Sequence, residues 1–225
     1  MMEWDFTAAF SNIDLLLLGL LNTLKVTGLA LCLGIPLGLV LALTRLTHLR
    51  PLSLLAAFII EFFRTTPPLV QLFWFFFAFP ILFDINMTAF TAAIVTFSIQ
   101  SSAFFAEIFR SGIQSIDHGQ WEGAKAIGMT RQQSLKRVIL PQAVKRMIPA
   151  FMERSIELLK TTTLVSTIAY TDLMYQANDL AQKTFRPLEV YSVVALIYFM
   201  LIFSVSQLSI LIERRLARSG EGTVH

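Results

Sequence analysis

The chain has 225 residues and a net charge of +3; 55% of its residues are hydrophobic and 15% are charged. Its mean hydropathy of +0.65 lies far above that of a soluble domain, and its long apolar runs predict an all-α protein that crosses a membrane several times. The single cysteine, Cys32, excludes an intrachain disulfide and a cysteine-based metal site. The basic residues cluster beside apolar runs, which favours membrane topology over nucleic-acid binding.

Five apolar runs predict about five membrane-spanning helices in one transmembrane domain that covers residues 1–225. The chain before the first run is acidic and has no Lys or Arg, so a secretory signal peptide is not expected there. In the first run, Gly34 and Gly38 predict a face on which another helix packs closely. In the second run, Pro67 and Pro68 forbid a regular helix and predict a bend. The expected spans are residues 15–44, 52–79, 87–109, 148–170 and 190–212.

Residues 110–147, between the third and fourth runs, are polar and basic and predict a loop with two short capped helices. Asp117 is a good N-cap with Gln120 at the capping-box spacing, and Gly128 is well placed to end the first helix in a left-handed turn. At about 15 Å this helix is too short to cross a bilayer. Its centre consists of glycine and alanine, so one face allows another backbone to come close.

A second helix in this loop is predicted by Thr130 and Gln133, which repeat the capping-box spacing, and it is expected to end at Pro141. Taken alone, the two helices are compatible with an amphipathic loop that merely connects two membrane spans. The other interpretation is a docking element for a partner protein, held just outside the membrane.

The same stretch resembles the EAA loop of the permease subunits of ABC importers. The resemblance rests on Glu122-Gly123-Ala124, on Gly128 and on Val138-Ile139-Leu140-Pro141, with glycine and valine at two positions where alanine and isoleucine are usual. In that family the loop forms the coupling helix, which binds the separate ATPase. The resemblance therefore implies that ATPase coupling involves Gln120, Glu122, Gly123, Ala124, Gly128, Met129, Leu140 and Pro141.

Three further segments resemble the branch of this family that transports polar amino acids, such as the histidine, glutamine and glutamate permeases. They are residues 61–72 (EFFRTTPPLVQL), 102–112 (SAFFAEIFRSG) and 160–164 (KTTTL). The resemblance implies a type I importer in a bacterial cytoplasmic (inner) membrane, in which the chain pairs with a second permease chain, identical or related. It also implies an extracytoplasmic amino-acid-binding protein and two ATPase subunits that bind ATP and Mg²⁺, with no cofactor on this chain itself.

The distribution of Lys and Arg predicts which ends of the spans face the cytoplasm. Cations follow the first, third and fifth runs, among them Arg45, Lys125 and Arg214, whereas none lies before the first run or in the loop around Asp84. The loop after the fourth run has two cations among several acidic residues. Five spans, with the N-terminus outside and the C-terminus in the cytoplasm, satisfy this rule and place the EAA-like loop in the cytoplasm.

The sequence contains no motif that supports catalysis by this chain. The P-loop motif G-x-x-x-x-G-K-[ST] is absent, and so is the zinc motif H-E-x-x-H. Asp117 and His118 are neighbours at a helix start, where capping explains them better than a catalytic dyad that lacks a nucleophile at a recognisable spacing. The chain is therefore expected to be a transport subunit and not an enzyme.

Polar residues inside the predicted spans are candidates for a substrate path, because a charged side chain at the centre of a span costs roughly 2.5–3.5 kcal/mol and normally faces protein or water. Glu153, Glu157 and Lys160 follow one stripe of the fourth span. They either bind a zwitterionic substrate or serve packing and gating, with Glu157 paired to Lys160. The candidate path residues are Asn22, Thr23, Gln100, Ser101, Ser102, Glu153, Glu157, Lys160 and Thr161.

Two acidic–basic pairs at i,i+3 spacing, Glu61 with Arg64 and Glu107 with Arg110, also have two interpretations. They either stabilise the helices that carry them or take part in transport. The second pair borders the predicted docking loop and is a candidate anchor for it.

The function that the motifs favour is an ATP-driven permease for a polar amino acid. One alternative is an ion-coupled secondary transporter, but such folds usually contain an internal repeat, and the sequence shows none. Another is a membrane scaffold without transport activity, which needs no polar stripe in its spans.

Overall fold

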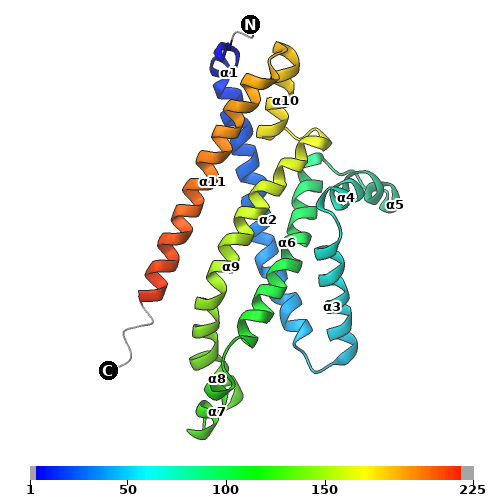
Figure 1. Ribbon diagram of the computed structural model, residues 1–225. Helices are drawn as coiled ribbons and strands as arrows, with labels where there is room; N and C mark the ends of the chain where they lie inside the picture. The colour runs from blue at the N-terminus through cyan, green and yellow to red at the C-terminus, as the bar shows by residue number, and fades with distance from the viewer. Residues whose placement is uncertain (1–3, 219–225) are drawn as a thin grey trace.

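The structure, a computed structural model, describes residues 4–218, and every regular element in that part of the chain is helical (Figure 1). The all-α prediction is therefore confirmed; the ends of the predicted domain, residues 1–3 and 219–225, lie outside the described residues. Two π-helical turns (Trp74–Ala78 and Leu135–Ile139) and a 3-10 segment (Thr162–Ile168) interrupt the α-helices. The α-helices are α1 (Thr7–Ser11), α2 (Ile13–Arg45), α3 (Arg50–Thr65), α4 (Pro68–Phe73), α5 (Phe79–Phe83), α6 (Ala89–Gln114), α7 (His118–Ala126), α8 (Arg131–Ser134), α9 (Leu140–Thr161), α10 (Leu173–Thr184) and α11 (Pro187–Arg218).

Three helices in the described part of the chain are long and apolar enough to cross a membrane, namely α2, α6 and residues 187–212 of α11. The pair formed by α3 and residues 68–83 meets the same criterion only as one span that is bent by 105°. The bend falls at Pro67 and Pro68, as the sequence predicts, because neither proline has an N–H to continue the helix. α9 has 22 residues but too many charges for this criterion, so a span at residues 148–170 remains a prediction.

α2 and α6 lie side by side and run in the same direction through the middle of the molecule (Figure 1). A Cβ added at Gly34 would lie 2.9 Å from the Cβ of Ser101. One added at Gly38 would lie 2.7 Å from the Cβ of Phe105. Side-chain carbons do not approach one another so closely, so glycine is what allows these backbones to meet. The close-packing face predicted from the two glycines is confirmed, with α6 as its partner.

The prediction that Pro141 stops the second loop helix is wrong. α8 continues through the π-helical turn 135–139 into α9, which begins at Leu140 with Pro141 in its first turn. The wider turn shifts the hydrogen-bond partners just before the proline, so the missing N–H is accommodated without ending the helix. The helix predicted from residue 148 therefore starts much earlier, and its α-helical part ends at Thr161.

The segment predicted as a polar loop, residues 171–189, contains helix α10. Its N-cap is Asp172, whose Oδ1 accepts a hydrogen bond from the backbone N–H of Tyr175 at 2.9 Å. Buried apolar residues of α10 pack with those of α1, α2 and α11 at one end of the molecule. α7 and α8 lie at the opposite end (Figure 1). The fold thus has one end closed by α10 and another end from which a short helical loop projects.

Candidate functional site

α7 is a nine-residue helix that projects from the bundle at the end opposite α10 (Figure 1). Its N-cap is Asp117, as predicted, and Oδ1 of this residue accepts a hydrogen bond from the N–H of Gly119 at 2.9 Å. The predicted capping box with Gln120 does not form, because the side chain of Gln120 instead accepts a hydrogen bond from Gln142 of α9 at 3.1 Å. This bond ties the projecting helix to α9.

Gly128 ends α7 in a left-handed conformation, with φ of +79°, as the sequence predicts. The N–H of Gly128 donates to the carbonyl of Lys125 at 3.0 Å. The N–H of Met129 donates to the carbonyl of Ala124 at 3.1 Å, and the two bonds together form a Schellman motif. The capping box predicted for the following helix is also present. Both ends of α7 are therefore fixed by local hydrogen bonds.

The two faces of α7 have different surroundings. Ala124 is buried, with 5% of its surface exposed, and it faces the rest of the loop. Glu122 and Gly123 are exposed, and a Cβ added at Gly123 would meet nothing within 4 Å. Ile127 is 73% exposed although it is apolar. We call the surface formed by Glu122, Gly123 and Ile127 the outward face of α7. Ile127 was not among the residues predicted for coupling, although an isoleucine in a polar loop is a sequence signal for a contact site.

The base of the loop is fixed to the bundle by an apolar cluster, in which partly buried residues of α6 pack against buried residues of the loop and of α9. Gly112 of α6 lies directly against the side chain of Met147 of α9, where a Cβ would have no room. Leu140 and Pro141, which were also predicted to take part in coupling, are exposed on α9 and lie at this base rather than on α7. The buried residues of the cluster are Ile116, Ile139, Ala143 and Met147.

A second group of predicted residues lies on α9, away from the loop. Glu153, Glu157 and Lys160 are all exposed, as expected for one stripe of the helix. The structure pairs Glu157 with Arg154 rather than with Lys160, the partner suggested by the sequence. Oε2 of Glu157 accepts a hydrogen bond from Nη1 of Arg154 at 2.7 Å. Arg154 was not predicted as a site residue, yet its side chain is only 6% exposed.

Phe104 of α6 contacts two arginines that are distant in the sequence. The Cζ of Arg154 on α9 lies 3.4 Å from the centroid of the Phe104 ring, and that of Arg64 on α3 lies 5.6 Å from it. Both contacts are cation–π interactions. Arg64 also forms the predicted ion pair with Glu61, at 3.6 Å. Sequence periodicity missed this cluster because it shows which residues share a helix face but not which helix that face meets.

The polar residues predicted for the path on α6 are buried. Gln100, Ser101 and Ser102 each have 2% or less of their surface exposed. Ser102 donates a hydrogen bond to the carbonyl of Ile99 at 2.6 Å. Oε1 of Gln100 and Oγ of Ser101 have no hydrogen-bond partner among the described residues. A buried polar atom without a partner is costly, so these two groups still need water or a ligand.

Three other candidates for the path have partners within the chain. Asn22 and Thr23 of α2 hydrogen-bond the backbone of Thr171 and Leu173 at 2.8 and 3.2 Å, respectively. These bonds hold α2 against the start of α10. Thr161 donates to the carbonyl one turn earlier in α9, at 2.9 Å. Their contacts favour a structural role for these three residues.

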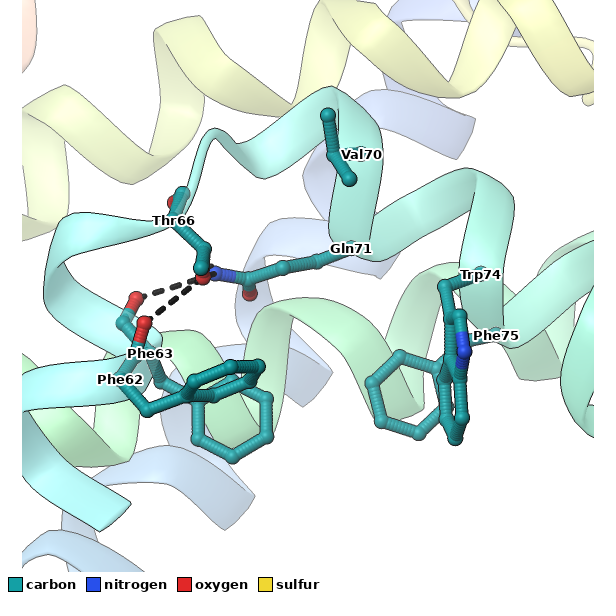
Figure 2. A pocket seen from close by; sticks show the side chains of 7 residues that line it. All are labelled: Phe62, Phe63, Thr66, Val70, Gln71, Trp74 and Phe75. Atoms are coloured by element: carbon teal, nitrogen blue, oxygen red, sulfur yellow. Dashed lines mark hydrogen bonds between the residues drawn. The ribbon is translucent and has the colours of Figure 1, made fainter. Parts of the chain in front are cut away.

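The bend between α3 and α4 borders an apolar cavity of about 260 Å³ (Figure 2). Nε2 of Gln71 reaches back across the bend and donates to the carbonyls of Phe63 and Thr66, each at 3.1 Å. The carbonyl of Phe63 needs this donor because Pro67, four residues later, has no N–H. The cavity is lined by Phe62, Phe63, Thr66, Val70, Gln71, Trp74 and Phe75.

Comparison with known proteins agrees with the motifs in the sequence. Residues 34–218 match the family described as the inner membrane component of binding-protein-dependent transport systems. The chain is 35% identical to the arginine transport system permease protein ArtQ of Bacillus subtilis, over 96% of this chain and 98% of ArtQ. It is 34% identical to the glutamate/aspartate import permease protein GltK of Escherichia coli O157:H7, over 96% of this chain and 100% of GltK.

A solved structure shares the whole fold. It is described as the crystal structure of an amino acid ABC transporter with histidines, and it matches 95% of this chain and 100% of its own with a TM-score of 0.91 and 40% identity. These proteins are permease subunits of ABC importers, a class in which the ATPase is a separate partner. The type I permease fold and the resemblance predicted from the EAA-like loop are therefore confirmed. The chain belongs to the family of inner membrane components of binding-protein-dependent transport systems.

Proposed function

We propose that this chain is the permease subunit of an ATP-driven importer that carries a polar amino acid across the cytoplasmic membrane. The family match and the amino acid permeases among its relatives support this function. Neither an ion-coupled transporter nor a scaffold without transport activity has comparable support. The names of ArtQ and GltK include both a cationic and two anionic amino acids, so the relatives alone leave the charge of the substrate open.

The observation that carries this proposal is the projecting helix α7. Its caps and its bond to Gln142 define its shape before any partner binds, so little conformational freedom is lost on docking. We assign contact with the ATPase to the outward face of α7, with Ala124 and Gly128 shaping the helix from within the loop. The chain continues from α8 through a π-helical turn into α9, so a movement of α7 is passed on to the charged stripe of α9.

The proposed topology has the N-terminus and α10 outside the cell and α7, α8 and the C-terminus in the cytoplasm. The cations of the loop support it, because basic residues favour the cytoplasmic side. In this arrangement α9 is the fourth of five spans although it is charged. Its exposed carboxylates and Lys160 then face a second permease chain or water rather than lipid.

The proposed substrate path runs along this stripe of α9 and past the buried polar groups of α6. Gln100 and Ser101 each offer an oxygen that has no partner among the described residues. Glu153, Glu157 and Lys160 offer charges of both signs on an exposed face. An amino acid that leaves water needs partners for both its ammonium and its carboxylate group, and this set contains both kinds.

The proposed complex contains a second permease chain, identical or related, two ATPase subunits and an extracytoplasmic amino-acid-binding protein. ATP and Mg²⁺ bind to the ATPase subunits, and this chain binds no cofactor. Its place is the inner membrane of a bacterium, as a multi-pass protein.

The test is to reconstitute the chain with its ATPase and binding protein in liposomes and to measure the uptake of labelled amino acids. Uptake is expected only when ATP is present on the α7 side of the membrane, and it should persist after ionophores remove the ion gradients. Uptake that needs an ion gradient and proceeds without the ATPase would refute the proposal.

A further inference from the structure

Arg154 of α9 belongs neither to the outward face of α7 nor to the residues of the proposed substrate path, yet a buried arginine is costly to keep inside a membrane protein. Arg154 has only 6% of its side chain exposed, whereas its partner Glu157 is 61% exposed. The same asymmetry holds on α3, where Glu61 is 63% exposed and Arg64 is half as exposed, at 32%. In both pairs the guanidinium lies deeper in the protein than the carboxylate that accompanies it.

The two guanidinium groups meet at one aromatic ring. Their Cζ atoms lie 3.4 Å and 5.6 Å from the centroid of Phe104, so they are at most 9.0 Å apart. Two positive charges at such a distance repel each other strongly where water is scarce. The Phe104 ring offsets this repulsion only in part, because a ring face is a weaker partner than an anion. Glu61 and Glu157 also offset it only in part, because their side chains are 63% and 61% exposed and water screens their charges.

Both arginines also retain an N–H without an acceptor. The Nε atoms of Arg64 and Arg154 are buried and have no hydrogen-bond partner among the described residues. The Nε–H and a neighbouring Nη–H of a guanidinium form a planar fork that matches the two oxygens of a carboxylate. Each arginine therefore keeps a donor suited to an oxyanion, at a point where donors normally have acceptors.

We propose that Arg154 and Arg64 form a carboxylate-binding subsite next to Phe104, and that this subsite selects an amino acid with an acidic side chain. This inference rests on the proposed function, which leaves the charge of the substrate open. An acidic amino acid has two carboxylates and one ammonium group. Two guanidiniums match the carboxylates, and Glu153 on the exposed stripe of α9 can accept the ammonium. A basic amino acid would instead bring a further cation next to two existing ones.

The subsite draws its residues from three helices, α3, α6 and α9. α9 continues from the projecting loop, and α3 ends at the proline bend. A relative movement of these helices changes the spacing of the two guanidiniums, and with it the affinity for a substrate whose two carboxylates they hold. The cluster therefore links release of the substrate to the movement that the ATPase drives.

The test is to measure the direct binding of three amino acids to the complex of permease and ATPase in lipid nanodiscs, without the binding protein. L-Glutamate, L-glutamine and L-arginine are compared by equilibrium dialysis for the wild type and for Arg154→Gln. We expect the wild type to bind glutamate about tenfold or more tightly than glutamine, with arginine weakest. Arg154→Gln should bring the glutamate-to-glutamine ratio near one while glutamine affinity changes little. Arg50→Gln, the same change at an exposed site at the start of α3, is the matched control and should keep the wild-type ratio.

The thermal unfolding of each variant shows whether its fold is intact, and Arg64→Gln provides a second variant if Arg154→Gln does not assemble. A wild type that binds arginine or glutamine at least as well as glutamate overturns the inference but leaves amino acid import standing. An unchanged glutamate preference in both arginine variants overturns it too, since the cluster is then purely structural. Failure to bind any of the three amino acids, together with the absence of ATP-driven uptake, overturns both the inference and the proposed function.

Discussion

Arg45, the last residue of α2, donates a hydrogen bond to Glu107 of α6, with 3.1 Å between Nη1 and Oε2. Glu107 also accepts a hydrogen bond from Arg110, one turn further along the same helix, which confirms that predicted pair. About three quarters of each of these side chains is shielded from solvent. One carboxylate therefore joins the ends of α2 and α6 just before the chain enters the loop that carries α7.

Glu107→Gln is expected to destabilise the fold by about 1–3 kcal/mol, because two partly buried arginines lose their shared anion. The matched control is Glu61→Gln on α3, whose carboxylate is mostly exposed and pairs at 3.6 Å, and it should cost less than about 1 kcal/mol. Thermal unfolding in detergent compares the two variants. Equal shifts in both would show that the junction of α2 and α6 is not held by Glu107.

The contact between α2 and α6 gives a second prediction. Gly34→Leu should prevent correct packing, because even a Cβ at this position would lie 2.9 Å from Ser101. Gly28→Leu, on the same helix, is the control, since a Cβ there meets nothing within 4 Å. The yield of monodisperse protein and the unfolding temperature should fall sharply for the first variant and little for the second. A tolerated leucine at Gly34 would contradict the close approach.

The sequence was most informative where one local rule decides the structure. Gly34 and Gly38, the two adjacent prolines and Gly128 were interpreted correctly because each acts on the backbone nearby. Pro141 was misinterpreted because the π-helical turn before it depends on how α8 and α9 continue into one another. α10 was missed because it lies outside the long apolar runs, although two local signals mark it: its cap Asp172, and apolar residues at helical spacing that are buried, namely Leu173, Ala177, Leu180 and Ala181.

The candidate sites also contain some features that neighbouring residues determine and others that depend on contacts between helices. The caps and the left-handed turn of α7 follow from neighbouring residues, so the shape of the loop was predictable. The face of α7 that points outward was not predictable from neighbouring residues. Ala124, for example, was expected at the surface that contacts the partner, but it is buried inside the loop. The cluster of Arg64, Phe104 and Arg154 unites three helices, and no periodicity within one helix can show that meeting.

The outward face of α7 gives a third prediction, about coupling. Gly123→Trp should leave the chain folded, because the added side chain points into open space, and should block association with the ATPase. Gln182→Trp on α10, at the other end of the molecule, is the matched control and should keep the ATPase bound. Co-purification and ATP-driven uptake measure the effect. A Gly123→Trp variant that couples normally would place the ATPase contact elsewhere.

The turn that ends α7 gives a related prediction. Gly128→Val places a β-branched residue at φ of +79°, which costs about 1 kcal/mol or more and disfavours the turn between α7 and α8. Insertion and overall unfolding should change little, whereas ATP-driven uptake should be lost because α7 is no longer held in place. Gly128→Asn is the control, since asparagine tolerates this conformation better, and it should keep part of the activity. Equal uptake by the valine and asparagine variants would mean that this turn does not matter for coupling.

At the end of the molecule opposite α7, Asp172 gives a prediction about how stability depends on pH. This N-cap of α10 is fully buried, and its Oδ2 has no hydrogen-bond partner among the described residues. Burial raises the pKa of this carboxyl from its usual value of 3.8 to about 6. Between these two values the folded protein holds a proton that the unfolded chain has released. Stability must therefore fall as pH rises through this range and become level above it.

Asp172→Asn should remove this dependence, because asparagine cannot ionise and is still a good N-cap for α10. The unfolding temperature of the wild type is expected to fall between pH 4.5 and pH 7. The unfolding temperature of the variant should fall clearly less over the same range. At pH 7 the variant should be at least as stable as the wild type, since the cost of the buried charge is then fully present only in the wild type. Asp179→Asn is the matched control, because that carboxylate lies near the surface of the same helix and pairs with Lys183. Parallel pH profiles for the wild type and Asp172→Asn would show that the buried carboxyl does not titrate in this range.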